Sequence, residues 1–107
     1  MITAYLPQGG QLQRIELTPD SVLPDGTVWV DLLEPTAAEE KAIERLLEIE
    51  MPTREEMQEI EISSRLYREG DASYMTANIL YHAETPVPQT TAVTFMRTPR
   101  AVVTLRF

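Results

Sequence analysis

Three glutamates near the middle of the chain have the residue type and spacing of a cation site. Glu55 and Glu59 are separated by one helical repeat, and Glu56 lies within the same stretch, so a helix would place them close together on one side. Carboxylate oxygens suit hard cations such as Mg²⁺ and Ca²⁺, and Mg²⁺ keeps several waters and touches few carboxylates. Helical glutamates also commonly form a solvated face and nothing more. Spacing alone therefore leaves metal binding and plain solvation both open.

Other reactive side chains lack the partners that catalysis requires. The single histidine, His82, has no acid or nucleophile at a recognisable spacing. The Ser63 and Ser64 pair lacks the glycines of a nucleophile elbow. Trp29 beside Asp31 could bind a ligand, although a lone tryptophan more often packs in a core. Cysteine is absent, which excludes thiol catalysis, disulfides and cysteine-ligated metals. We therefore expect a protein that is not an enzyme.

Two capping boxes predict the starts of the helices that must position the glutamates. Thr36 is followed three residues later by Glu39, and Thr53 by Glu56. In each pair the threonine hydroxyl can accept from the glutamate amide, and the glutamate carboxylate can accept from the threonine amide. The apolar positions at helical spacing are Ala38, Ala42, Ile43, Leu46 and Leu47 in the first helix and Met57 and Ile60 in the second. The first helix therefore has a full apolar stripe and the second only a narrow one.

The rest of the chain is typical of β-strands. Apolar and β-branched runs alternate with clusters of glycine, proline and aspartate, which punctuate strands and hairpins. The run at residues 28–33 is almost wholly apolar, as in a buried central strand. The other predicted strands are residues 2–6 and 12–17 around a turn at 7–10, residues 66–68 and 74–81 around a turn at 69–71, and residues 91–96 and 101–107 around a turn at 98–100.

The order β-β-β-α-α-β-β-β-β predicts an α/β fold, a mixed sheet with a helical pair packed on it. The 107 residues fit one domain. The last predicted strand runs to Phe107, and we expect it at an edge of the sheet. An uncovered edge or apolar face there predicts self-association. The chain reads as the first part of a longer protein.

Charge is concentrated in one segment. The net charge is −8, which argues against nucleic acid as a partner and disfavours an anionic membrane surface. No apolar run is long enough to span a bilayer and no secretory signal is present. Ten of the seventeen acids lie between residues 34 and 61, namely Glu34, Glu39, Glu40, Glu44, Glu48, Glu50, Glu55, Glu56, Glu59 and Glu61. Plain solubility and cation binding are both compatible with this distribution.

Several segments, in order, resemble the N-terminal cytoplasmic domain of the CorA family of magnesium and cobalt transporters. Residues 28–35, Val-Trp-Val-Asp-Leu-Leu-Glu-Pro, resemble the family's tryptophan–aspartate–leucine strand running into its first helix. Residues 56–67 resemble its acidic helix end and serine–arginine–aromatic turn, and residues 92–96 and 102–106 resemble its later strand pair. The resemblance covers nearly the whole chain and depends on the order and spacing of these segments together.

The resemblance implies a cytoplasmic α/β/α sandwich at the inner membrane, followed by long helices and two transmembrane helices in a homopentamer. The pore motif of that later part is absent here, so the resemblance implies a soluble regulatory domain that does not conduct ions. Mg²⁺, with Co²⁺ also possible, would bind between neighbouring subunits. Glu59, with Glu56 nearby, best matches the sensing carboxylate and would supply half of that site, so weak or no Mg²⁺ binding is expected in this chain alone. Two alternatives stay open: a free-standing acidic interaction module, and the cytoplasmic domain of the superfamily's zinc-transporting branch.

Overall fold

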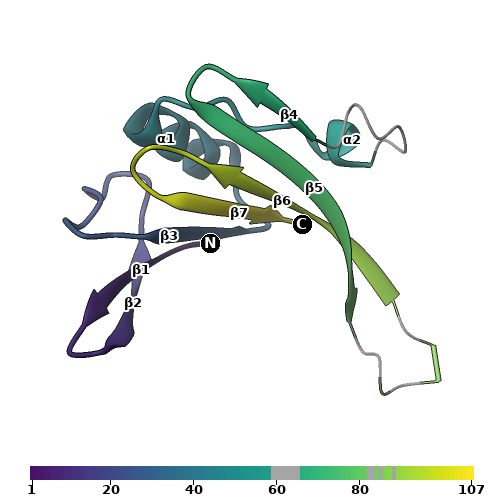
Figure 1. The fold of residues 1–107 in the computed structure, drawn as a ribbon, viewed down its shortest axis with the longest axis horizontal. Coiled ribbons are helices and arrows are strands. Elements are labelled where there is room, and N and C mark those ends of the chain that lie inside the picture. The colour runs from purple at the N-terminus through teal and green to yellow at the C-terminus, as the bar shows by residue number, and fades with distance from the viewer. Residues whose placement is uncertain (59–65, 82–83, 85, 88) are drawn as a thin grey trace.

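The computed structural model describes residues 1–58, 66–81, 84, 86–87 and 89–107. Within them the chain forms a mixed seven-stranded sheet in the order β2-β1-β3-β7-β6-β5-β4 (Figure 1). All neighbouring strands are antiparallel except β3 and β7, which are parallel. The elements are β1 (Ile2–Gln8), β2 (Gln11–Leu17), β3 (Trp29–Leu33), α1 (Ala37–Leu47), α2 (Arg54–Met57), β4 (Leu66–Glu69), β5 (Ala72–Tyr81), β6 (Gln89–Arg97) and β7 (Val102–Arg106). The predicted fold class, a mixed sheet with a helical pair, is confirmed.

The three hairpins that the turn residues predicted all form. Gly9 and Gly10 both have positive φ, 59° and 81°, which a two-residue hairpin loop of matching twist requires. The strands of this hairpin run up to the glycines, so β1 is longer than predicted and includes Pro7, which lies beyond the reach of β3. The turn between β6 and β7 is held by Thr98, whose hydroxyl donates to the Ala101 carbonyl at 2.6 Å and accepts from the Ala101 amide at 3.0 Å.

The strand that ends beside Phe107 lies in the middle of the sheet, so the prediction of an edge strand was wrong. β7 pairs with β3 on one side and β6 on the other, and the edges are β2 and β4. The physical reason is the burial of β7, whose Val103 and Leu105 are fully shielded from solvent, as expected for a strand with neighbours on both sides. The expectation of self-association through that edge therefore loses its basis.

Helix α1 begins with the predicted capping box. The Thr36 hydroxyl accepts from the Glu39 amide at 3.2 Å, and the Glu39 carboxylate accepts from the Thr36 amide at 2.9 Å. The amino group of Met1 donates to the same carboxylate at 3.1 Å and to the Leu33 carbonyl at 2.8 Å. The Thr36 hydrogen bond, and then this amino group, hold the pKa of Glu39 below its ordinary value against the opposing effect of burial. The start of the helix is thereby tied to the first residue of the chain.

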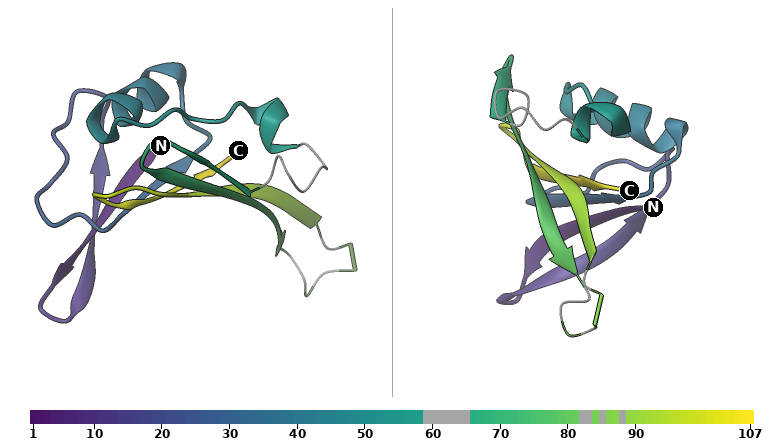
Figure 2. Two further views of the ribbon diagram at one scale, coloured as in Figure 1. Left: turned by 45° about the horizontal axis from the view of Figure 1, so that its top comes forward. Right: turned by 90° about the vertical axis from the view of Figure 1, so that its right-hand side faces the viewer.

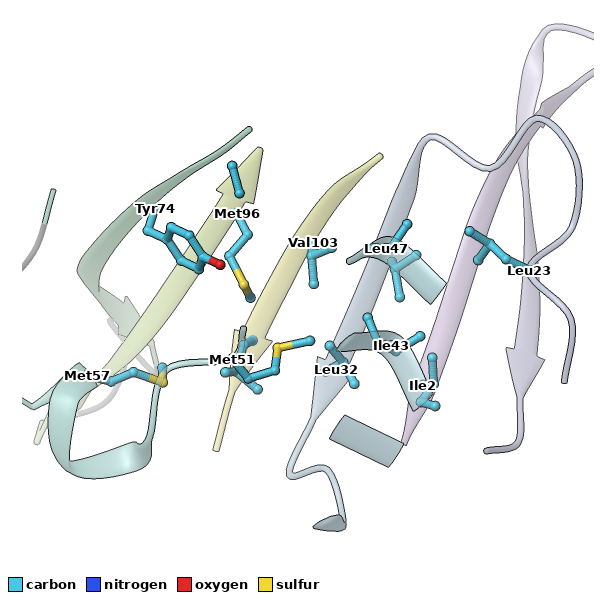
Figure 3. Packing of buried hydrophobic residues seen from close by; sticks show 13 residues of the cluster. Ile2, Leu23, Leu32, Ile43, Leu47, Met51, Met57, Tyr74, Met96 and Val103 are labelled. Carbon is cyan, nitrogen blue, oxygen red and sulfur yellow. The ribbon is translucent and has the colours of Figure 1, made fainter. Parts of the chain in front are cut away.

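Both helices lie on one face of the sheet (Figure 2). Ala42, Ile43 and Leu47 are the buried side of α1, whereas Ala38 of the predicted stripe is exposed. Side chains from the strands meet the helices and the segment between them in one apolar core (Figure 3). That core contains Ile2, Leu23, Val30, Leu32, Ile43, Leu47, Met51, Met57, Ala72, Tyr74, Met96, Val103 and Leu105. We call this side of the sheet the covered face and the other side the second face.

None of the helices in the described ranges is both long and apolar enough to cross a membrane.

Candidate functional site

The glutamate that the structure describes at the predicted site, Glu56, is part of a helix cap. Its carboxylate Oε1 accepts from the Thr53 amide at 2.9 Å, and its own amide donates to the Thr53 hydroxyl at 3.1 Å. The side chain is exposed. The capping box predicted from sequence is therefore present in full, and it engages one carboxylate oxygen of Glu56.

The other half of the predicted pair, Glu59, lies outside the described residues, as do His82 and the serine pair at 63–64. Glu55 is described and exposed. Among the residues with described positions, no three acidic or histidine side chains come together in a way that could hold a metal ion. The assignment of Glu59 and Glu56 to a metal site stays a prediction, and any complete site needs ligands beyond those described.

Two stacked tyrosines lie among the glutamates of this region. The rings of Tyr67 and Tyr74 are 4.7 Å apart and nearly parallel. The Tyr74 hydroxyl donates to the Glu50 carbonyl at 2.9 Å and accepts from the Glu50 amide at 3.2 Å. Burial first, and then Tyr74 and the carboxylates of Glu56, Glu69 and Glu50, raise the pKa of Tyr67 to about 12. The negative potential of the glutamates thus reaches the covered face of β4 and β5.

Helix α2 is attached to the sheet at two points. The Met57 side chain is buried in the core. The Arg54 guanidinium lies over the ring of Phe107, 5.7 Å from its centroid, which is a cation–π distance. The helix carrying Glu56 therefore touches the residue that directly follows β7.

The second face holds a polar network across the parallel pair β3 and β7. Trp29 Nε1 donates to the Thr104 hydroxyl at 2.9 Å, and that hydroxyl donates to Asp31 Oδ1 at 2.6 Å. Arg106 donates to Asp31 Oδ2 at 3.2 Å. The Trp29 ring stacks on Tyr5 with centroids 4.2 Å apart. Both oxygens of Asp31 are engaged, so this carboxylate joins the two strands.

Sequence reasoning correctly placed Trp29 in packing, but it missed Thr104 and Arg106 as partners of Asp31. The network joins residues more than 70 positions apart in the chain. The local sequence held no signal for it, because pairing of β3 with β7 was not predicted.

Away from this network the second face exposes apolar side chains. Alternation along the strands places Leu66, Met75 and Ile79 on this side, and they are 66%, 46% and 41% exposed. Val102 of β7 is likewise 41% exposed. Fold and site together thus define a small α/β domain with an acidic helical side, one closed face and one face that is partly apolar and open.

Comparison with known proteins identifies the family to which this chain belongs. The chain is 38% identical over 82 residues to the magnesium transport protein CorA of Campylobacter jejuni, covering 75% of this chain and 25% of the relative. It is 30% identical over 81 residues to the CorA of Yersinia pestis, covering 76% and 25% respectively. No family model matches the chain. The chain belongs to the CorA family and corresponds to its N-terminal part. It spans about a quarter of the length of these curated relatives.

A solved structure matches the fold. The complete CorA magnesium transporter from Methanocaldococcus jannaschii superimposes with a TM-score of 0.64, covering 98% of this chain and 32% of that one. Sequence identity is 11%, so the likeness concerns the fold. The superposition covers nearly all of this chain and about a third of that transporter's chain.

Proposed function

We propose that the chain is the cytoplasmic regulatory domain of a CorA-type channel for divalent cations, Mg²⁺ or Co²⁺, and does not itself conduct ions. The observation that supports this most strongly is the agreement of two comparisons. Similarity to CorA proteins extends over three quarters of the chain, and the fold match to a CorA transporter extends over nearly all of it. Because the chain spans about a quarter of its relatives, conduction would reside in the remainder.

The acidic helical side would sense the ion. Glu59 would be the principal ligand, and Glu56 would offer the carboxylate oxygen that its helix cap leaves unused. In a pentamer, a neighbouring identical subunit would supply the remaining ligands. A bridging ion offsets repulsion between two acidic surfaces, and it favours whichever arrangement of subunits binds it better. High internal Mg²⁺ would thus hold the channel closed.

The second face would be covered by the helices that follow in the full-length protein, completing an α/β/α sandwich. Its exposed Leu66, Met75 and Ile79 form the kind of apolar surface that marks a contact with further protein. The contact between Arg54 and Phe107 would connect the sensing helix to the start of those helices. This provides a short physical path from a bound ion to the membrane part.

A Mg²⁺ titration of the chain followed by NMR tests the proposal. Saturable shifts confined to residues near 56–61 are expected, weak because half the site is missing, and Glu59→Ala should abolish them. Glu56→Gln removes the charge while an amide can still cap the helix, so it separates ligation from helix stability. Glu16→Gln on β2 is the matched control. Competition by Ca²⁺ and Zn²⁺ reports selectivity.

Two outcomes would contradict a half-site on this helix. One is the absence of any shift, and the other is a set of diffuse shifts that added salt abolishes, since such shifts indicate only a solvated acidic face. Shifts that Zn²⁺ produces and Mg²⁺ does not would favour the zinc-transporting branch.

A further inference from the structure

An open hollow of about 350 Å³ lies at one end of the second face. It lies between the β4–β5 turn and the β6–β7 turn. Its lining consists of Arg68, Asp71, Ser73, Arg97, Thr98 and Pro99. The lining is mostly polar, unlike the apolar residues that the second face exposes elsewhere.

Strand register brings the two arginines to either side of one serine. Arg68 of β4 is paired with Ser73 of β5, and Ser73 is paired with Arg97 of β6. Residues paired directly across a sheet share a face, and neighbouring strands are about 4.8 Å apart. The two arginine backbones are therefore about 10 Å apart, a span that two guanidiniums can close above the serine hydroxyl.

The hollow carries an excess of positive charge, which would attract an anion. The chain as a whole has a net charge of −8. Even so, neither Arg68 nor Arg97 forms an ion pair with any residue of the described ranges. The ion pairs there are Met1 with Glu39 and Arg106 with Asp31. One carboxylate, Asp71, lines the same hollow. Two cations and one anion leave a local excess of one positive charge.

The hydrogen-bond donors in the hollow are also available. The Thr98 hydroxyl is committed to its own turn. The Ser73 hydroxyl and both guanidiniums make no recorded hydrogen bond to the described part of the chain. Two planar guanidinium forks with a hydroxyl between them match the geometry of a tetrahedral oxyanion, which arginine binds in a bidentate manner.

We propose that this hollow binds an oxyanion of the phosphate class through Arg68, Arg97 and Ser73. A free phosphate or phosphate monoester and a phospholipid headgroup present the same chemistry. The soluble source is the expected one, because the acidic segment of the chain repels an anionic surface. The proposal is independent of metal sensing, which involves other residues.

The test is an NMR titration with inorganic phosphate at ionic strength held constant with chloride. Saturable shifts of the Ser73 and Thr98 amides are expected. Arg68→Gln and Arg97→Gln should each weaken binding by about tenfold or more, since each removes charge-assisted hydrogen bonds. Arg14→Gln is the matched control, because Arg14 is exposed on β2 and its loss changes the net charge equally. Amide chemical shifts that are unchanged elsewhere in the spectrum establish that each variant is folded.

A second arm distinguishes the sources of the phosphate group. Flotation is carried out with vesicles of phosphatidylglycerol and, as control, of phosphatidylcholine. Binding of free phosphate without flotation supports the soluble source. Flotation with phosphatidylglycerol that depends on Arg68 and Arg97 supports the headgroup. Absence of both, or equal weakening by Arg14→Gln, overturns the proposal.

Discussion

The two faces of the sheet are built from the same strands but are closed by different interactions. On the covered face, Val30, Leu32, Val103 and Leu105 are fully buried against the helices. On the second face, the centre of the sheet is shielded by the network around Asp31, and the β4–β5 end exposes apolar side chains. The comparison teaches that the covered face supplies most of the stability of this chain, while the second face carries surface suited to further contacts.

The largest effect is expected from removing apolar volume on the covered face. Leu105→Ala should lower the free energy of unfolding by about 2–5 kcal/mol, because it leaves a cavity in a fully buried site. Urea unfolding monitored by circular dichroism measures the change. Val102→Ala, three positions earlier in the same strand but 41% exposed on the second face, should cost much less. Equal costs would contradict the difference between the faces.

The next effect concerns the polar network on the second face. Asp31→Ala should cost about 1–3 kcal/mol, because it deprives the buried Thr104 hydroxyl of its acceptor. Thr104→Val and the double variant complete a cycle that measures the coupling between the two side chains. Arg106→Gln should cost less than about 1 kcal/mol, since its guanidinium is half exposed and partly screened. A negligible coupling would mean that the network does not stabilise the parallel pair.

A smaller effect should follow from loosening the helix that closes the covered face. Thr36→Ala removes the cap of α1 and should cost about 1 kcal/mol in unfolding free energy. Thr53→Ala should cost less, because α2 is a four-residue helix with one buried side chain. Thermal or urea unfolding of the two variants ranks them. The reverse order would place more of the stability in α2 than its burial indicates.

The covered face should also respond to alkaline pH through Tyr67. Its pKa is raised from 10.0 to about 12 in the folded protein, so its stabilising effect is fully present below pH 10 and is lost as pH rises towards 12. The direction follows because the folded state holds the phenolic proton more tightly than the unfolded state. Absorbance titration of the phenolate locates the pKa, and Tyr67→Phe should reduce the loss of stability above pH 10.

The smallest effect is expected at the apolar positions left exposed on the second face. Ile79→Thr should change the stability of this chain by no more than about 0.5 kcal/mol, as for ordinary surface positions. The same substitution in a full-length relative should cost more if following helices cover this face. Unfolding or protease-resistance measurements on both proteins compare the costs. Equal, small costs in both would argue that this part of the face stays open.

The outcome of sequence reasoning separates local from long-range features. The capping boxes at Thr36 and Thr53 were predicted with their partners, because every group involved lies within one helical turn. The hairpins were predicted for the same reason. The central place of β7 was not predicted. Its parallel partner β3 lies far away in the sequence, and the residues of a strand do not by themselves indicate which strand it pairs with. The partners of Asp31 were missed as a direct result.

The candidate site was predictable only in part. The cap at Glu56 followed from its spacing to Thr53, whereas its proximity to Tyr67 depends on where β4 lies beneath the helices. The two arginines of the hollow are 29 positions apart in the chain. They meet only because β5 lies between their strands.

The central place of β7 has a consequence for the order in which the molecule can form. In the sheet, β7 alone lies between the β2-β1-β3 group and the β6-β5-β4 group. During synthesis both groups leave the ribosome before β7, the strand that joins them. Until β7 pairs with them, β3 and β6 each present an unpaired edge. Such edges invite incorrect pairing, and the high sequence separation of the β3–β7 contacts predicts slow folding. The last five-residue strand thus determines when two half-sheets become one domain.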